Sequence, residues 1–595
     1  MQTKTPTGAE TVTWDLSPLY NGIADPTLDA DLNRADELAA ELDAEYRGRI
    51  ASLDAAGLRT LIARYEDAVA LNARPMEYAY LAWAADTANS DASRLLARTQ
   101  ERQSRFQQAT VFIELELAAL PDLEARLAAP ELNDRRHLLE VAALRRPYLL
   151  TEPEEKVMAE MLNTGANAWV RLFDETHAAA RYTVNGQDLN QEEVLDLLYD
   201  PEREARIAGW RALTNGLREA KGLNTFIFNQ LLSVSASNDR LRGYPTWVTA
   251  RNVANEVDDD SVQALVDAGS ARYDLVRRYY TLKRDLLGVD ELFDYDRYAP
   301  LPAADARYRW DEARAIVLDS FGRFHPAMQA AAGRIFDERW IDAAPTPSKQ
   351  AGAFCSEVVH DLQHPYVLMT YQGRISDVQT LAHELGHGLH GYLAAPRGPL
   401  MADTPLTTAE TASTFAEMLV FTDLLEQQTD PAVRLALLAD KIENTFATVF
   451  RQVSMNRFEH AIHTLRRESG MELTTEQFNM LWLQSQRDMF GDSVTMTDEY
   501  GLWWSYVWHF VGAPGYVYAF AFGELLVMAL FARYQQGVEG FADAYLGALA
   551  AGGSDWPHAL MQPLGVDLTD PGFWQEGLAI IEGMIAQAEE LAAQL

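Results

Sequence analysis

Apolar residues recur at intervals of three and four positions along most of the chain, with Ala, Leu, Glu and Arg between them. The pattern is clearest over 32–70, 92–128 and 193–218, and it resumes after Asn190 and continues to about Gly333. Such spacing places the apolar side chains on one face of a helix, and the intervening residues are strong helix formers. The sequence therefore predicts a mainly α protein.

Two short stretches depart from the helical pattern. Residues 181–189 alternate around Asn185-Gly186, a dipeptide favoured in tight hairpin turns, and predict a β-hairpin. The run PYVLMTY over 365–371 has the β-branched and aromatic content of a strand. Because the hairpin separates two helical regions, we expect an N-terminal helical domain over 1–180 and a second domain over 181–595.

The least charged stretch of the chain runs from Tyr516 to Ala532 and is interrupted by Gly523 and Glu524. A membrane span with these interruptions would be poor, so a buried core helix is the preferred interpretation and no membrane partner is expected. The N-terminal residues MQTKTPTGAETVTWDLS lack the apolar segment of a secretory signal. We therefore expect a cytoplasmic protein.

The net charge of the chain limits the kinds of molecule that it is expected to bind. The 595 residues include 50 Lys and Arg against 87 Asp and Glu, a formal net charge of −37. Nucleic acids are bound through Lys and Arg that displace counterions, so this balance argues against a nucleic-acid partner. The single cysteine, Cys355, cannot form an internal disulfide, and nothing in the chain requires an oxidising compartment.

Five of the twelve histidines fall within residues 360–390. Two of them, His383 and His387, are four positions apart in the sequence HELGH, with Glu384 between them. On a helix over about 377–392, both imidazoles project from one face about one turn apart. This spacing is typical of zinc sites in which two imidazoles bind the ion and the glutamate takes a proton from water. Chance yields roughly 0.04 such motifs in a chain of this composition.

A catalytic zinc usually has three protein ligands and one open position. The first glutamate after His387 is Glu410, 23 residues further along, where a second helix is predicted to begin. Thr407, three residues earlier, gives Glu410 an alternative role in a capping box. Glu417 follows two turns later on the same face, either to orient a ligand imidazole or as a buried structural carboxylate.

Hydrolysis of an amide also requires donors for the oxyanion. The aromatic run over 503–518 offers His509, Tyr516 and Tyr518, although an aromatic core would look much the same. Because three ligands complete a catalytic zinc shell, structural or substrate-lining roles are expected of three other histidines near the motif, namely His360, His364 and His390. Gly386 and Gly388 are expected to permit close approach of another helix.

Four segments, in the same order along the chain, resemble the zinc oligopeptidases of the oligoendopeptidase F and thimet oligopeptidase type, and are most similar to the oligoendopeptidase F branch. They are YQGRISDVQTLAHELGH (371–387), ETASTFAE (410–417), FRQVSMNRFE (450–459) and PGYVYAFAFG (514–523). The resemblance covers about residues 180–590.

The resemblance implies a two-lobed helical molecule with a deep central channel and a small β element beside the zinc helix. It implies that the channel admits short peptides, and that the strand over 365–371 pairs with the substrate backbone. It also implies one zinc ion, bound by His383, His387 and Glu410. The catalytic zinc-peptidase domain would then be the second domain, 181–595.

The same resemblance implies that Glu384 is the general base and that His509 and Tyr516 stabilise the transition state. The family's tail Tyr-Val-Tyr-Gln-Tyr is replaced by Tyr-Val-Tyr-Ala-Phe over 516–520, so one phenol is absent. Tyr518 is therefore retained as an alternative donor.

The leading hypothesis is a zinc-dependent oligoendopeptidase that hydrolyses internal bonds of short peptides. One alternative is a peptidyl-dipeptidase or carboxypeptidase of the same zinc class, which needs a cation such as Arg374 or Arg451 for the free carboxylate of its substrate. Another is a non-catalytic peptide-binding scaffold. The sequence leaves the oligomeric state open.

Overall fold

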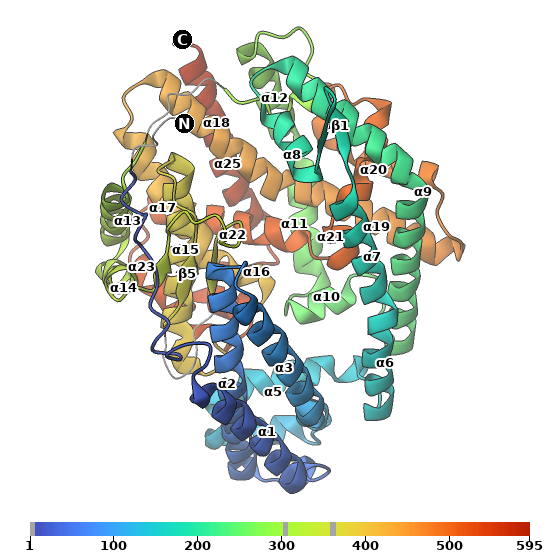
Figure 1. Cartoon of the computed structure of the whole chain (residues 1–595), viewed down its shortest axis with the longest axis vertical. Helices are drawn as coiled ribbons and strands as arrows, with labels where there is room; N and C mark the ends of the chain where they lie inside the picture. The colour runs from blue at the N-terminus through green and yellow to red at the C-terminus, as the bar shows by residue number, and fades with distance from the viewer. Residues whose placement is uncertain (1–5, 302–306, 357–363) are drawn as a thin grey trace. The chain divides into compact units, whose positions relative to one another are not determined.

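The computed structural model describes residues 6–301, 307–356 and 364–595, and helices dominate this part of the chain (Figure 1). The chain forms two compact units, each assembled from three separate stretches. Unit 1 comprises Met1–Pro147, Asp305–Glu426 and Arg533–Asp567, and unit 2 comprises Tyr148–Ala304, Gln427–Ala532 and Leu568–Leu595. The predicted mainly α fold is confirmed, whereas the predicted channel stays a prediction.

The regular elements of unit 1 are helices and three short strands. Its helices are α1 (Pro26–Tyr46), α2 (Ala55–Ala85), α3 (Ser90–Ala118), α4 (Leu123–Leu127), α5 (Arg136–Arg145), α13 (Trp310–Phe324), α14 (Pro326–Asp337), α15 (Ile375–Ala394), α16 (Leu406–Ala409), α17 (Thr411–Gln427), α23 (Phe541–Ala551) and α24 (Pro557–Met561). Its strands are β3 (Ile341–Asp342), β4 (Phe354–Ser356) and β5 (Tyr366–Leu368).

The regular elements of unit 2 are mostly helical as well. The α-helices, the strands and the longest 3-10 helix are α6 (Glu152–Thr164), α7 (Ala166–Ala179), β1 (Tyr182–Val184), β2 (Gln187–Leu189), α8 (Gln191–Asp196), α9 (Arg203–Arg242), α10 (Thr249–Ala254), α11 (Asp259–Ala271), α12 (Tyr273–Leu286), α18 (Pro431–Thr448), α19 (Phe450–Ser469), α20 (Thr475–Phe490), the 3-10 helix η7 (Asp498–Tyr506), α21 (His509–Gly512), α22 (Tyr518–Gln535) and α25 (Pro571–Ala592).

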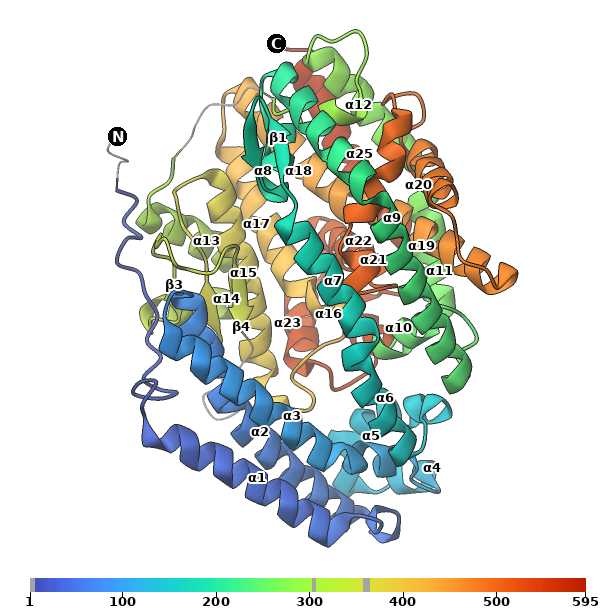
Figure 2. The same cartoon turned by 45° about the vertical axis from the view of Figure 1, so that its right-hand side comes forward.

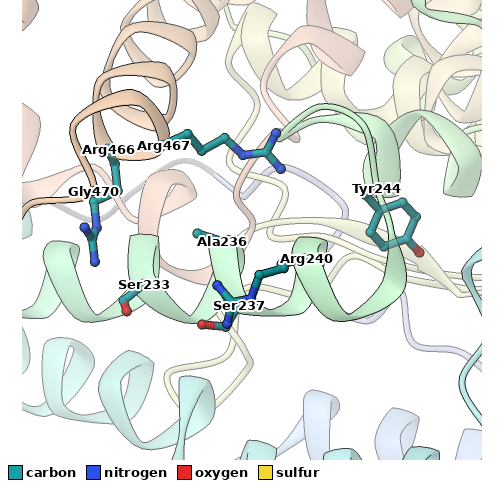
Figure 3. A pocket seen from close by; sticks show the side chains of 8 residues that line it. All are labelled: Ser233, Ala236, Ser237, Arg240, Tyr244, Arg466, Arg467 and Gly470. Carbon is teal, nitrogen blue, oxygen red and sulfur yellow. The ribbon is translucent and has the colours of Figure 1, made fainter.

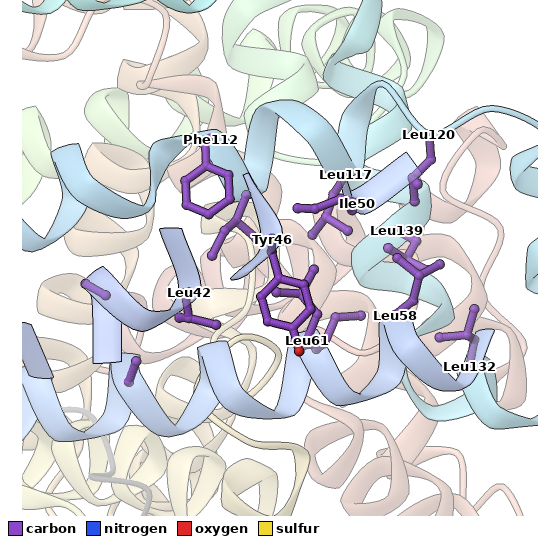
Figure 4. Close-up of a cluster of buried hydrophobic side chains, with 14 of the residues drawn as sticks. Leu42, Tyr46, Ile50, Leu58, Leu61, Phe112, Leu117, Leu120, Leu132 and Leu139 are labelled. Atoms are coloured by element: carbon purple, nitrogen blue, oxygen red, sulfur yellow. The ribbon is translucent and has the colours of Figure 1, made fainter. Parts of the chain in front are cut away.

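The N-terminal part of unit 1 is held together by an apolar core between α1, α2 and α3, which lie side by side in Figures 1 and 2. Figure 4 shows Leu42 of α1, Leu58 and Leu61 of α2, and Phe112 and Leu117 of α3 within this core. Each of these side chains is buried. Burial of one such side chain contributes about 1.5–3 kcal/mol, so the apolar periodicity of the sequence accounts for this helical layer.

A three-stranded sheet packs beside α15, the helix that carries the HELGH motif. The strand order is β3-β5-β4, with β3 parallel and β4 antiparallel to β5. The strand predicted over 365–371 is present as β5, but it is the central strand. Both of its edges already pair within the sheet, so the expectation that this strand pairs with substrate is wrong. Among the described strands of this sheet, β3 and β4 are the ones that present an edge.

The predicted hairpin is present in unit 2. Strands β1 and β2 are antiparallel, with Val184 opposite Gln187. The two turn residues, Asn185 and Gly186, have φ of 51° and 82°, as a tight type I′ turn requires. The hairpin lies within unit 2, and a domain boundary near residue 180 stays a prediction.

The weakly charged segment over 516–532 forms most of α22, and the side chains from Leu525 to Leu530 are fully buried. The interpretation as a core helix is confirmed. Among the described residues, no helix combines the length and the apolar character that crossing a bilayer requires.

Candidate metal centre

The HELGH motif lies within α15, as predicted, and the start of this helix is well capped. The carboxylate of Asp377 accepts hydrogen bonds from the backbone N–H groups of Gln372 and Arg374, at 2.8 and 2.9 Å. These bonds satisfy backbone donors that have no partner within the helix. Leu381 and Leu385 are fully buried and anchor α15 in unit 1. The two histidines of the motif are thereby held on a fixed helix.

The three predicted ligands converge on one point. The Nε2 atoms of His383 and His387 each lie 3.3 Å from Oε2 of Glu410. One donor atom from each residue lies within 4.8 Å of the others. Tetrahedral zinc with bonds of about 2.0–2.1 Å separates its donors by about 3.3–3.4 Å. The donor set therefore fits an ion of the size of zinc.

Glu410 occupies the junction between α16 and α17, where its φ and ψ are −86° and 3°. Helix α16 begins at Leu406, so Thr407 lies inside it and is not its N-cap. The capping-box alternative for Glu410 is therefore wrong. Instead, Oε2 of Glu410 accepts a hydrogen bond of 2.7 Å from the hydroxyl of Ser413. Ser413 was not among the residues predicted from the sequence, although its position three residues after Glu410 is a signal that could have indicated this contact.

Glu417 contacts the far side of one imidazole. Its Oε2 lies 3.4 Å from Nδ1 of His383, while Nε2 of the same ring faces Glu410. A carboxylate at this position fixes the orientation of a ligand imidazole. Of the two roles considered for Glu417, the geometry favours orientation of His383.

The electrostatics of the cluster match a cation site. Burial lowers the pKa of His383, but hydrogen bonds to Glu410 and Glu417 outweigh burial and raise this pKa to about 10. Burial raises the pKa of Glu410, but hydrogen bonds from His383 and His387 hold it well below its usual range. The carboxylates thus create a negative potential at the imidazole of His383, which a cation bound there would also experience.

Glu384 is the most buried of the three ionisable side chains in the motif, with 6% of its surface exposed. Its carboxylate forms no hydrogen bond or ion pair with another residue in the described ranges 6–301, 307–356 and 364–595. Burial raises the pKa of Glu384. The structure therefore leaves this carboxylate beside the three donors without a competing protein partner.

Gly386 allows α15 to approach the start of α17, as predicted. A Cβ atom at this position would lie 2.5 Å from the carbonyl oxygen of Ala412 and from Cα of Ser413. Both of these atoms belong to the backbone, which cannot move aside as a flexible side chain can. The close approach brings the backbone beside Glu410 to the histidine helix.

Replacing Gly386 by Ala is expected to destabilise the protein by about 1–3 kcal/mol, because the new methyl group overpacks the interface between the two helices. The variant should also bind zinc more weakly, since the backbone next to Glu410 must move. Denaturant unfolding and zinc titration measure the two effects.

Gly333→Ala in α14 is the matched control, because a Cβ there meets nothing within 4 Å. This change should leave zinc affinity unchanged and stabilise the helix by up to about 1 kcal/mol. Wild-type stability and zinc affinity in Gly386→Ala would contradict the proposed role of this close contact.

The predicted oxyanion donors lie in unit 2. His509 and Tyr516 are both partly exposed, and their rings are parallel with centroids 6.1 Å apart. Burial, assisted by the charge of Arg451, lowers the pKa of His509, which favours the neutral imidazole. Tyr518 differs, because it is fully buried and its phenol oxygen accepts a 2.8 Å hydrogen bond from the Asn255 side chain. The structure makes Tyr516 accessible and places Tyr518 in the core.

Two residues to which the sequence analysis gave no role hold the loop before Tyr516. The backbone N–H of Gly515 donates to Oε1 of Glu459 at 2.9 Å, and the carbonyl of Pro514 accepts from Arg251 at 3.4 Å. Glu459 is 1% exposed, and burial raises its pKa to about 8. The feature of the sequence that could have indicated this role is a single carboxylate on the apolar face of α19.

The other histidines near the motif have structural surroundings. His364 stacks on Trp340 with ring centroids 4.0 Å apart, and burial lowers its pKa. His390 is buried as well, and burial lowers its pKa to about 4. His360 lies outside the described residues. For His364 and His390 the geometry favours structural roles.

The fold and the donor cluster together define a mainly α protein with a candidate metal site on an HELGH helix. The chain matches the family described as "Peptidase family M3" over residues 196–580 and the family described as "Oligopeptidase F" over residues 116–182. It therefore belongs to peptidase family M3 and is a peptidase.

Named relatives agree with this assignment. The chain is 26% identical over 593 residues to oligopeptidase PepF of Bacillus subtilis, covering 97% of this chain and 87% of the relative. It is 26% identical to group B oligopeptidase PepB of Streptococcus agalactiae, with 86% of each chain covered.

Solved structures support the fold. A putative peptidase from Chlamydophila abortus has a TM-score of 0.85 at 23% identity and covers 98% of both chains. Oligoendopeptidase-F from Enterococcus faecium has a TM-score of 0.71 at 23% identity, covering 96% of this chain and 98% of its own.

Proposed function

We propose that this protein is a zinc-dependent oligoendopeptidase that hydrolyses internal peptide bonds of short peptides. The observation that carries the proposal is the convergence of His383, His387 and Glu410, with the carboxylate of Glu384 beside them. Membership of a peptidase family makes peptides the substrate class. The relatives' names, oligopeptidase and oligoendopeptidase, support short peptides as substrates.

One zinc ion bound by the three ligands would supply Lewis-acid polarisation of the scissile carbonyl and lower the pKa of water. The protein's own contribution begins with Glu384. Its carboxylate oxygen takes a proton from the attacking water and then delivers that proton to the leaving amine nitrogen. Because Glu384 has no competing partner among the described residues, its carboxylate is available for both transfers.

Glu417 and Ser413 act through the ligands. Glu417 accepts from Nδ1 of His383, which leaves Nε2 of that ring as the donor to the metal. The hydroxyl of Ser413 donates to Oε2 of Glu410 and limits rotation of this carboxylate. Both residues preserve the geometry of the donor set between turnovers.

We assign oxyanion stabilisation to His509 and Tyr516, whose ring N–H and phenol O–H are donors on partly exposed side chains. Tyr518, the alternative donor, is assigned to the core because its phenol is fully buried and bonded to Asn255. The parallel rings of His509 and Tyr516 support their acting as a pair.

Tyr516→Phe is expected to lower kcat by about 10²–10³-fold with little change in KM, because it removes a donor that acts mainly in the transition state. Tyr518→Phe should keep kcat near the wild-type value and lower the melting temperature, because it removes the buried hydrogen bond between Asn255 and Tyr518. Steady-state kinetics and thermal unfolding of both variants separate the two roles. A large loss of kcat in Tyr518→Phe alone would reverse the assignment.

The function is tested by incubating the protein with a pool of short peptides, some amidated at the C-terminus, and identifying the products by mass spectrometry. Internal cleavage of blocked peptides is expected, as is its loss on chelation and recovery with zinc. Release of only C-terminal residues or dipeptides from unblocked peptides would favour the exopeptidase alternative. Absence of both zinc and hydrolysis would favour a binding scaffold.

A further inference from the structure

A groove of about 450 Å³ lies within unit 2, between α9 and the C-terminal end of α19 (Figure 3). Eight residues line it, and none of them is acidic. Three of the eight are arginines: Arg240, Arg466 and Arg467. The whole chain has a formal net charge of −37, whereas this groove is lined by three cationic side chains and no carboxylate.

The groove gathers hydrogen-bond donors. Ser233, Ser237 and Arg240 follow one another at four- and three-residue intervals on α9, so they share one helix face. Figure 3 shows Arg466 reaching toward this face from the end of α19. Within the described ranges, the side chains of these four residues form no hydrogen bond or ion pair with other residues. Nε of Arg466 is buried without a partner.

The third arginine is fixed in place by the protein. Arg467 donates to Asp239 at 2.7 Å and to the carbonyl oxygen of Pro245 at 3.2 Å. Asp239 is buried and does not line the groove. Two guanidinium charges, on Arg240 and Arg466, are therefore left facing the groove without a carboxylate partner among the described residues.

Cations are favoured near helix C-termini by the helix dipole, and Arg240 and Arg466 lie in the last turns of α9 and α19. The dipole accounts for basic residues at these two helix ends. It does not account for two serine hydroxyls without partners on the same face, or for the absence of a carboxylate from the lining. These two features are what an oxyanion site requires.

We propose that this groove binds the dianionic phosphate group of a small molecule. Two unpaired guanidinium groups match a charge of nearly −2, and their forked N–H groups with the two hydroxyls match three acceptor oxygens. A carboxylate carries one negative charge and two acceptor oxygens, so it would leave part of the positive charge and some of the N–H and O–H donors of the groove unmatched. The volume falls within the range of small-molecule sites and leaves room for an organic group beside the phosphate.

This site is separate from the proposed peptidase function, since none of its lining residues belongs to the metal cluster or to the predicted oxyanion donors. A binding measurement tests it without reference to hydrolysis. The zinc-loaded full-length protein is titrated calorimetrically with inorganic phosphate and with glycerol 3-phosphate, at ionic strength held constant with potassium chloride. Acetate is titrated in parallel.

Saturable binding of at least one phosphate compound is expected, together with a loss of tenfold or more in affinity in the double variant Arg240→Gln/Arg466→Gln. The double variant Ser233→Ala/Ser237→Ala should weaken phosphate binding by a smaller factor. Because it keeps both arginine charges, it provides the test of the site if the arginine variant fails to fold. Tighter binding of glycerol 3-phosphate than of phosphate identifies an organic monoester as the ligand, and the reverse identifies free phosphate.

The matched control is Arg211→Gln, an exposed arginine on α9 outside the groove, which should bind phosphate as the wild type does. Phosphate bound at the metal centre would survive in the double variant, because that variant leaves the metal ligands intact. The proposal is overturned if neither phosphate compound saturates by about 10 mM. It is also overturned if acetate binds equally well, or if both the arginine and the serine variants retain wild-type affinity.

Discussion

Glu384→Gln is expected to lower kcat/KM for peptide hydrolysis by three or more orders of magnitude while the protein retains stoichiometric zinc. The amide has nearly the shape of the carboxylate but cannot take a proton from water at neutral pH. A positioned general base contributes about 10²–10⁴-fold to rate. Since Glu384 serves both the attacking water and the leaving amine in the proposed mechanism, the loss should lie toward the upper part of this range.

Cleavage of an internally quenched peptide, combined with metal analysis of the same sample, measures both quantities. Glu219→Gln provides the matched control, because it makes the same chemical change at an exposed position on α9, outside the candidate centre. More than a tenth of the wild-type activity in zinc-loaded Glu384→Gln would show that another group transfers the proton. Loss of zinc from the variant would instead assign Glu384 a role in metal binding.

The candidate donor cluster could be predicted from the sequence because two of its members are close neighbours along one helix. His383 and His387 are four residues apart, and helical geometry alone places both on one face of α15. Glu410 was predicted as the third ligand because it is the first glutamate after His387. The alternative, that Glu410 takes part in a capping box, depends on the residue at which the helix begins. Helix α16 begins one residue before Thr407, a difference that sequence patterns do not resolve.

Contacts between distant parts of the chain could not be predicted in the same way. Glu459 bonds to Gly515 across 56 residues and Asn255 bonds to Tyr518 across 263, and no helical or strand periodicity reports such pairs. The same limit explains the error over residues 365–371. Their composition identifies a strand, but its place at the centre of the sheet depends on β3 and β4, which are short and carry little periodic signal.

Glu410→Ala is expected to remove zinc binding and peptide hydrolysis together. The variant retains only two imidazoles as donors, whereas a catalytic zinc site needs three protein ligands. Glu417→Gln should behave differently, because Glu417 contacts Nδ1 of His383 rather than the shared donor point. Loss of such an orienting carboxylate typically weakens metal affinity by about 10–100-fold, so this variant should remain active when zinc is supplied in excess.

Competition with a chelator of known affinity, followed by an activity assay at saturating zinc, separates the two glutamates. The activity at saturating zinc distinguishes a ligand from an orienting residue. Excess zinc restores activity when the site only binds the ion more weakly, but not when the site lacks one of its donor atoms. If Glu410→Ala kept wild-type zinc affinity while Glu417→Gln lost zinc irreversibly, the two roles would be exchanged. The 3.3 Å separations from Glu410 to both imidazoles, against the single 3.4 Å contact of Glu417, favour Glu410 as the ligand.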